Sequence, residues 1–336
     1  MNKTMKKLAV GIMSLVLATG LMAGCAGGDS SSTASSDQKT VGVIQYATHP
    51  SLDNCYEGFI QGLEEGGFKE GENLKIDFTN AQGDAANGDM AAKNMVSKKY
   101  DLIAGIATPA AMSAYSASKS DGIPVVFTAV SDPVSAGIVK SLEKPETNCT
   151  GTADILPLED QMKMIRAFLP DAKKIGILYT NSEPNSVSHL KKFKELAGQY
   201  GFEIVEVGVT NASEVAAGAQ TLVSKGVDCI NNFTDNNVVN NLSTVLKAAN
   251  DAKIPVFGSE VEQVKNGCLA AQSIDYVALG KDTGLMAAKI LKGEAKPEEM
   301  AVQEVSGSEP VYNEEVLKSL GLTLPQELNG AEAVSK

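Results

Sequence analysis

The residues best suited to binding chemistry lie at the ends of short apolar runs in this sequence. Thr108, Thr128 and Ser131 lie at or just after the third and fourth runs and offer hydroxyl groups, whereas Glu183, Asp235 and Glu260 follow later runs and offer carboxylates. Hydroxyl and backbone N–H donors suit a carboxylate, and carboxylates suit an ammonium group, so the two sets together predict a small zwitterionic ligand. Helix capping and ordinary solvated acids explain the same composition, and that interpretation stays open at this point.

The other candidate binding residues follow the same rule, because ligands of open α/β sheets sit beyond the carboxyl ends of the strands. Thr108 and Asp132 each precede a proline, so we expect each to cap a helix that begins at that proline. The candidate ligand-binding residues are Tyr46, His49, Tyr56, Thr108, Pro109, Ala110, Thr128, Ser131, Asp132, Glu183, Asn185, Thr234, Asp235, Asn236 and Glu260. An apolar or aromatic pocket wall would be formed by Tyr46, His49, Leu52, Tyr56 and Phe233, although core packing explains Leu52, Tyr56 and Phe233 equally well.

The sequence offers little support for catalysis. His49 could act as a general base, but no serine or cysteine lies in a G-x-S-x-G elbow, and we expect His189 on the surface of a helix. No G-x-G-x-x-G follows a strand, and neither a Walker loop nor an H-E-x-x-H motif occurs. With no C-x-x-C pair and two histidines, a zinc site is not expected. We therefore predict a binding protein with no cofactor and no metal.

The elements that must position these residues alternate between strands and helices. From Thr40 onward we predict strands at 41–44, 74–78, 102–106 and 124–128, with helices at 52–65, 84–99 and 110–119. This order predicts a parallel sheet that is covered by helices on both faces.

The same pattern then begins again about 130 residues further on. We predict strands at 175–178, 203–207, 228–230 and 254–257, and a helix at 187–197. A chain of 336 residues also exceeds what one hydrophobic core usually supports. The predicted fold class is therefore α/β, with two similar doubly wound parallel-sheet lobes that are joined by a multi-strand hinge.

The predicted division assigns residues 39–150 and about 276–297 to lobe one, and residues 151–275 and about 298–327 to lobe two, with 328–336 as a tail. The crossings between the lobes are expected at 148–157, at 272–276 and between 297 and 311. A cleft between two hinged lobes can enclose a small ligand.

The N-terminus is typical of a secreted lipoprotein. Residues 1–7 are basic, residues 8–23 are almost continuously apolar, and Ala23-Gly24 directly precedes Cys25. A membrane-spanning helix needs about 20 apolar residues, so this run is too short for one and predicts a signal peptide over 1–24. Cys25 would be lipidated, and the Gly/Ser-rich segment 25–38 would be a flexible tether.

Charge and cysteine content complete the composition. The formal charge is −12, and the leader carries lysines but no acid, so the body is too acidic to bind nucleic acid through phosphate contacts. Beyond Cys25, the cysteines Cys55, Cys149, Cys229 and Cys268 allow three disulfide pairings, which spacing does not decide. We expect most of them to be small buried residues.

Several motifs together resemble those of the substrate-binding lipoproteins of ABC transporters whose members bind tryptophan, tyrosine or phenylalanine. Besides the lipobox and the tether, they are V-G-V-I-Q-Y at 41–46, Y-E-G-F at 56–59, A-T-P-A-A at 107–111, V-S-D-P-V at 130–134, Y-T-N-S-E-P-N-S at 179–186 and T-D-N at 234–236. The resemblance covers residues 40–325, and it implies a type I periplasmic-binding-protein fold that serves a permease with a cytoplasmic ATPase.

The resemblance also implies roles for individual residues. Thr108 and Ser131 would lie near the ligand carboxylate and Asp235 near its ammonium, while Glu183, Asn185 and Glu260 would line lobe two. An aromatic amino acid is the expected ligand, and the protein is expected to be a monomer that is anchored outside the cytoplasm. A sugar or nucleoside binder of the same fold and a surface-anchored α/β enzyme are the alternatives.

Overall fold

The structure, a computed structural model, describes residues 38–305 and 309–335. The predicted signal peptide, Cys25 and nearly all of the predicted tether lie outside the described residues. Within the part of the chain that is described, no helix is long and apolar enough to cross a membrane.

One half of the fold is built on a six-stranded parallel sheet with the strand order β11-β5-β4-β3-β1-β2. Its strands are β1 (Lys39–Gln45), β2 (Leu74–Asn80), β3 (Leu102–Ile106), β4 (Val125–Thr128), β5 (Cys149–Ala153) and β11 (Gln303–Glu304). Every residue of β3 and β4 is buried, as expected for central strands with helices on both faces.

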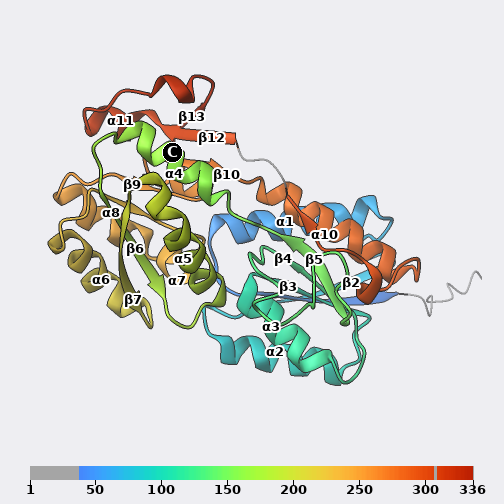
Figure 1. Ribbon diagram of the computed structural model, residues 1–336. Helices are drawn as coiled ribbons and strands as arrows, with labels where there is room; N and C mark the ends of the chain where they lie inside the picture. Colours follow the sequence, from blue (N-terminus) through green and yellow to red (C-terminus); the bar gives the residue numbers. More distant parts are fainter. Residues whose placement is uncertain (1–37, 306–308, 336) are drawn as a thin grey trace, which may run out of the picture. The chain divides into compact units, whose positions relative to one another are not determined.

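Four helices cover the two faces of this sheet. They are α1 (Pro50–Glu65), α2 (Ala85–Ser97), α3 (Thr108–Ser118) and α10 (Tyr276–Leu291). Helices α1 and α10 pack on the face that presents Val41, whereas α2 and α3 pack on the face that presents Ile44 (Figure 1). This alternation follows from the opposite directions of successive side chains in a strand.

The other half contains a four-stranded parallel sheet with the order β7-β6-β8-β9. The strands are β6 (Lys174–Thr180), β7 (Glu203–Val209), β8 (Cys229–Asn231) and β9 (Val256–Phe257). The helices are α4 (Leu158–Phe168), α5 (Pro184–Ala197), α6 (Ala212–Ser224), α7 (Asn236–Asn240), α8 (Leu242–Asp251) and α9 (Val261–Lys265). The predicted α/β fold with parallel sheets is therefore confirmed.

A small third sheet extends this half. It joins β10 (Ala270–Ser273) to β12 (Glu309–Asn313) in antiparallel fashion, and β12 to β13 (Glu332–Val334) in parallel, with α11 (Glu314–Ser319) after β12. Backbone hydrogen bonds from Gly258 N to Ala270 O (2.9 Å) and from Leu269 N to Val256 O (2.6 Å) connect β10 to β9.

Three short strands differ from the predicted division of the chain. β13 lies in the segment that was expected to be a tail, β11 pairs with the six-stranded sheet although its residues were assigned to lobe two, and β5 extends past residue 150. These strands have three, two and five residues, and β11 is exposed at both positions, so none carries a clear apolar pattern. The remaining boundaries of the lobes stay a prediction.

The backbones of helices α1 and α10 approach each other unusually closely. A Cβ atom added at Gly280 would lie 2.1 Å from the carbonyl oxygen of Cys55, and one at Gly58 would lie 2.0 Å from the carbonyl oxygen of Val277. The two backbones therefore approach each other as only glycine permits. This packing fixes the N-terminal ends of both helices, which carry Ser51 and Tyr276.

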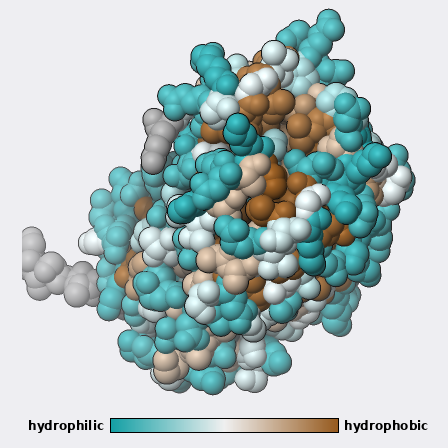
Figure 2. Space-filling model, turned by 90° about the vertical axis from the view of Figure 1, so that its left-hand side faces the viewer, coloured by the Kyte–Doolittle hydropathy of each residue, from teal (hydrophilic) through white to brown (hydrophobic). Residues whose placement is uncertain are grey.

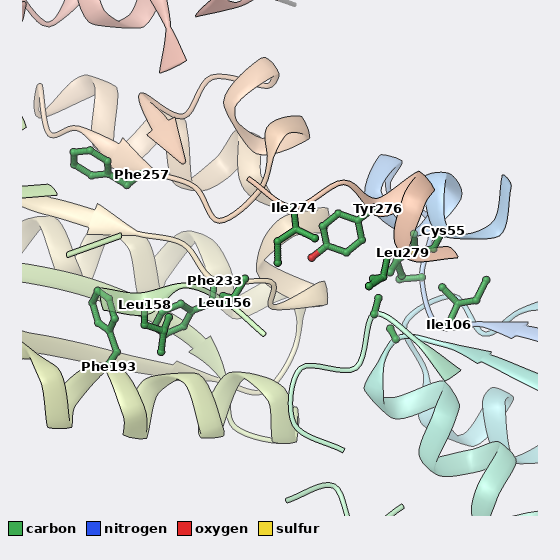
Figure 3. Packing of buried hydrophobic residues seen from close by; sticks show 14 of the residues in the cluster. Cys55, Ile106, Leu156, Leu158, Phe193, Phe233, Phe257, Ile274, Tyr276 and Leu279 are labelled. Atoms are coloured by element: carbon green, nitrogen blue, oxygen red, sulfur yellow. The ribbon is translucent and has the colours of Figure 1, made fainter. Parts of the chain in front are cut away.

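The interior and the surface agree with the composition. Cys55, Cys149, Cys229 and Cys268 are all buried and free, which confirms the expectation that they are small core residues. The face of the body in Figure 2 is mostly hydrophilic, with apolar side chains gathered near its centre. Figure 3 shows Ile274 and Tyr276 between the apolar residues around Phe233 and those around Leu279.

Candidate functional site

A cavity lies where the strands of both large sheets end, and the atom-free space in and around it, open solvent included, is about 340 Å³. Its walls are formed by His49, Ser51, Leu52, Ala107, Thr108, Ala129, Ser131, Asp154, Asn185, Thr234, Asn236, Val239, Glu260, Gln263 and Tyr276. The position agrees with the rule that open α/β sheets bind ligands beyond the carboxyl ends of their strands.

Two of the wall residues have strained backbones. Ala107 and Ala129 adopt φ angles of 77° and 55°, although neither is a glycine. Ala107 follows β3 and Ala129 follows β4, so both occupy the sharp turn at a strand end. Strain of this kind persists only where the surrounding structure enforces it, and it is concentrated at functional sites.

The start of α3 differs from the prediction in a way that matters for the cavity. Ala107 occupies the N-cap position, and Thr108 is the first residue of the helix rather than its cap. The Thr108 hydroxyl is therefore not used in capping. Its Oγ1 atom is buried at the cavity wall and has no hydrogen-bond partner among the described residues.

Other unpartnered polar atoms gather in the same walls. Among the described residues, Asn185 Oδ1, Thr234 Oγ1 and His49 Nδ1 are also buried without a hydrogen-bond partner, and all three residues line the cavity. Buried polar groups are normally hydrogen-bonded, and an unsatisfied one costs about 1–3 kcal/mol. Their concentration here is the expected signature of a polar binding site.

Two buried carboxyl groups line the cavity. Asp154 accepts hydrogen bonds from Ser131 Oγ (2.9 Å) and Tyr276 OH (2.8 Å), and burial raises its pKa to about 6. Glu260 accepts from the backbone N–H groups of Glu262 (2.7 Å) and Gln263 (2.9 Å), and burial raises its pKa to about 7. No lysine or arginine is among the residues that line the cavity. The cavity therefore favours a cation.

Asp235, the predicted partner of the ammonium group, does not line the cavity. Its carboxylate is buried and accepts from Thr180 N (2.6 Å), Thr180 Oγ1 (2.8 Å), Ser186 Oγ (2.7 Å) and Val238 N (2.9 Å). These four bonds use the acceptor capacity of the carboxylate, so in this geometry Asp235 has no free lone pair for the ligand ammonium, and its assignment to that group stays a prediction. Asp235 instead ties the end of β6 to the start of α7.

Glu183 lies behind the wall rather than in it. It accepts hydrogen bonds from Asn236 N (3.0 Å), Asn236 Nδ2 (2.7 Å), Asn237 N (3.1 Å) and Asn185 Nδ2 (3.2 Å). Burial, with a smaller contribution from the charge of Asp235, raises its pKa. Glu183 thus orients Asn185 and Asn236, which do face the cavity.

Asp132 is not among the residues that line the cavity, and it links the loop after β4 to helix α5. It accepts hydrogen bonds from Ser188 Oγ (2.6 Å) and Lys192 Nζ (2.9 Å) of α5, and from Ser135 N (3.0 Å) in its own turn. Burial alone would raise the pKa of Asp132, but these hydrogen bonds and the charge of Lys192 outweigh it and lower the pKa to about 2. The segment after Asp132 is a turn, not the expected helix.

The two histidines are both buried. His49 Nε2 lies 3.3 Å from Asn236 Oδ1 and so forms a second link between the two halves, and burial lowers its pKa. His189 was expected at the surface but packs against the ring of Phe233 at 5.5 Å, and burial lowers its pKa to about 3. Both are therefore neutral near pH 7. That His189 is buried was missed because its neighbours in the sequence are mostly polar.

Several other predicted residues lie outside the cavity. Tyr46 donates to Gly83 O (2.8 Å) near a separate opening, and Tyr56 packs against Phe78 with ring centroids 4.7 Å apart. Thr128 is buried and lies 3.8 Å from Cys55 Sγ, a hydrogen bond that it donates. Pro109 and Ala110 are buried in the first turn of α3.

The candidates that the structure does bring together are His49, Thr108, Ser131, Asn185, Thr234, Asn236 and Glu260. Ser51, Asp154, Gln263 and Tyr276 line the cavity but were not among the candidates. Asp154 directly follows β5, so the strand-end rule would have found it had β5 been recognised. Among the residues that the structure describes, no cluster of three His, Cys, Asp or Glu side chains is placed to hold a metal ion.

Comparison with known proteins gives consistent results. The family model described as ABC transporter substrate binding protein matches residues 40–335. A tyrosine-binding protein of Clostridioides difficile (strain R20291) is 40% identical over 324 residues, which cover 94% of this chain and 93% of the relative.

Two solved structures show the same fold. An ABC domain in complex with L-Trp from Streptococcus pneumonia is 36% identical with a TM-score of 0.84, and the match covers 89% of this chain and 99% of that one. The ligand-free, open structure of a substrate-binding protein with adhesive properties from Clostridium difficile is 43% identical, with a TM-score of 0.67 and coverage of 89% and 100%. The chain thus superposes better on the L-Trp complex, although its identity with the open protein is higher.

Proposed function

Because this chain belongs to the ABC transporter substrate binding protein family, we propose that it captures an aromatic amino acid in the cavity and delivers it to a permease. The observation that carries this proposal is the cavity itself, which combines an unpartnered hydroxyl at a helix N-terminus with two buried carboxyl groups that have no cationic partner in its walls. Such a site suits a ligand that carries both a carboxylate and an ammonium group.

The carboxylate end of the ligand is assigned to α3. This helix has 11 residues and begins at Thr108, at the cavity wall. Free backbone N–H groups and the positive end of the helix dipole favour an anion there. The Thr108 hydroxyl, which is buried and has no partner in the structure as described, adds a further donor.

The ammonium end is assigned to Asp154 and Glu260 in place of Asp235. Burial raises the pKa of both carboxyl groups, so an ammonium beside them would restore their ionised forms. Tyr276 donates a hydrogen bond from its hydroxyl group to Asp154, and Tyr276 also forms part of the cavity wall.

The apolar part of the wall completes the argument. Leu52, Val239 and the two strained alanines contribute aliphatic surface, and Tyr276 contributes an aromatic ring. These groups suit a flat apolar side chain. The relative from Clostridioides difficile is named for tyrosine and the solved structure from Streptococcus holds L-Trp, and both are aromatic amino acids.

Calorimetry on the body, residues 39–336, tests the proposal against tyrosine, tryptophan, a nucleoside and a sugar. Asp154→Asn keeps the shape of the side chain but removes the charge, and it should weaken amino-acid binding by about 30-fold or more, since the loss of a buried partner charge costs about 2–5 kcal/mol. Asp171→Asn, at an exposed aspartate, is the matched control. Binding by Asp154→Asn within threefold of the parent would overturn the ammonium assignment, and binding of the sugar or nucleoside alone would overturn the ligand class.

The cellular setting follows from the family and the leader. We propose that Cys25 carries the lipid anchor, that the body works outside the cytoplasm as a monomer without catalytic turnover, and that its partners are a permease and a cytoplasmic ATPase. Cys25→Ala should move the protein from the membrane fraction to the soluble fraction, because two acyl chains anchor stably whereas the tether has little apolar surface. Ser31→Ala in the tether is the control, and a Cys25→Ala protein that stays in the membrane pellet would refute the anchor.

A further inference from the structure

Four unpartnered atoms of the cavity wall are left over when a zwitterionic head group is placed at Thr108, Asp154 and Glu260. His49 Nδ1 and Ser51 Oγ lie at the start of α1. The other two are Asn185 Oδ1 and Thr234 Oγ1, both buried and without a hydrogen-bond partner among the described residues. They come from the start of α5 and from the loop before α7, in the half that contains the four-stranded sheet. Neither atom is needed by the carboxylate or the ammonium in the proposed function.

The orientation of the Asn185 amide is fixed by its surroundings. Its Nδ2 donates to Thr234 O (3.1 Å) and to Glu183 Oε2 (3.2 Å). A carbonyl oxygen such as Thr234 O cannot donate, so a flipped amide would place two acceptors against each other. Asn185 Oδ1 is therefore the atom left without a partner, and it is an acceptor.

This acceptor is also held rigidly. Glu183 is anchored by Asn236 N (3.0 Å) and Asn237 N (3.1 Å) at the start of α7, so the amide of Asn185 is clamped from the side opposite to its free oxygen. A polar group that is preorganised in a buried wall discriminates strongly against a ligand that leaves it unpaired.

We infer that the site demands a hydrogen-bond donor on the ring of its ligand, supplied to Asn185 Oδ1 with Thr234 Oγ1 beside it. A phenol O–H and an indole N–H both meet this demand, whereas an unsubstituted phenyl ring does not. The inference rests on the proposed function, and it narrows the aromatic amino acids to those of the tyrosine and tryptophan kind and excludes phenylalanine as a good ligand.

Calorimetric titration of the body with tyrosine, tryptophan and phenylalanine tests the inference. The parent should bind tyrosine at least tenfold more tightly than phenylalanine. In Asn185→Ala this preference should fall below threefold, mainly because tyrosine binding weakens. Asn250→Ala, at an exposed asparagine of α8, is the matched control and should keep the parent's preference.

Thr234 provides a second, milder pair of variants in case Asn185→Ala does not fold. Thr234→Val should reduce the preference for tyrosine, and Thr234→Ser should retain it. Titration with the des-amino analogue of tyrosine separates the ring from the amino group: if Asn185→Ala removes the penalty for a missing amino group instead, Asn185 Oδ1 contacts the ammonium and the inference is wrong.

The outcomes separate this inference from the proposed function. Phenylalanine binding within threefold of tyrosine in the parent would overturn the demand for a ring donor while leaving an amino-acid site in place. Failure of all three amino acids to bind would overturn the proposed function itself.

Discussion

Asp132, Ser188 and Lys192 form a latch that joins the loop after β4 to helix α5, across the two halves of the body. Asp132 and Ser188 do not line the cavity, so they need not touch the ligand. If the halves separate on opening, these bonds exist only in the conformation that encloses the ligand. Substitutions in the latch should therefore weaken binding by destabilising that conformation.

The size of the effect follows from the two contacts. The Ser188 hydroxyl donates to the Asp132 carboxylate over 2.6 Å, and a hydrogen bond to a charged group contributes about 1.5–3 kcal/mol when buried. The Lys192 side chain is 48% exposed, so its ion pair with Asp132 contributes about 0.2–1 kcal/mol. With part of the Ser188 bond open to water, Ser188→Ala should raise the Kd about 5- to 30-fold, and Lys192→Ala by about fivefold at most.

Calorimetry with tyrosine measures these Kd values, and thermal melts without ligand supply the control for folding. Lys191→Ala is the matched variant, since Lys191 lies on the same helix and has no ion pair among the residues that the structure describes. The ligand-free Tm should hardly change in Ser188→Ala. A Kd within 1.5-fold of the parent, or a weaker affinity fully accompanied by a lower ligand-free Tm, would refute the latch.

Two further predictions concern the stability of the ligand-free body. Burial holds the folded-state pKa of Asp154 at about 6 and that of Glu260 at about 7, above the values near 4 of an unfolded chain. Between about pH 4 and pH 7 the folded state then binds more protons than the unfolded chain, so the free energy of unfolding should fall as the pH rises through this window. A Tm at pH 8 equal to or above the Tm at pH 5 would contradict this prediction. Gly280→Ala should destabilise the fold by about 1–3 kcal/mol, because the added Cβ would lie 2.1 Å from Cys55 O. Gly198→Ala is the control and should be neutral, since a Cβ at Gly198 meets no described atom within 4 Å. Equal denaturant midpoints for the two variants would count against the close packing of α1 on α10.

The elements with strong apolar patterns could be predicted from the sequence almost to the residue. β3 begins and ends where the sequence places it, because it is a fully buried apolar run. The same rule led to Thr108, Ser131 and Glu260, since residues after strands of a parallel sheet meet at one edge.

The errors have a common physical origin in contacts that spacing does not encode. β5 reads Cys-Thr-Gly-Thr-Ala, which has no apolar signature, and therefore Asp154 was not recognised as a strand-end residue. Asp235 follows a strand in the expected manner, but its carboxylate is bound by Thr180, which lies 55 positions away in the sequence. Composition identifies an acid near the site, and only the fold decides whether that acid is still available to a ligand.

The site also suggests how affinity and specificity are connected. In the conformation described, Thr108, Asn185 and Thr234 each bury a polar atom that has no partner among the described residues, and each such atom costs about 1–3 kcal/mol. The latch at Asp132 opposes that cost but is too weak to cancel all three. A ligand that pairs every atom therefore shifts the body toward the enclosing conformation, whereas a ligand that leaves one unpaired both loses a contact and closes the body less fully. Ser188→Ala should then weaken the binding of tyrosine at least as much as that of phenylalanine, because a ligand that closes the body less fully gains less from the latch.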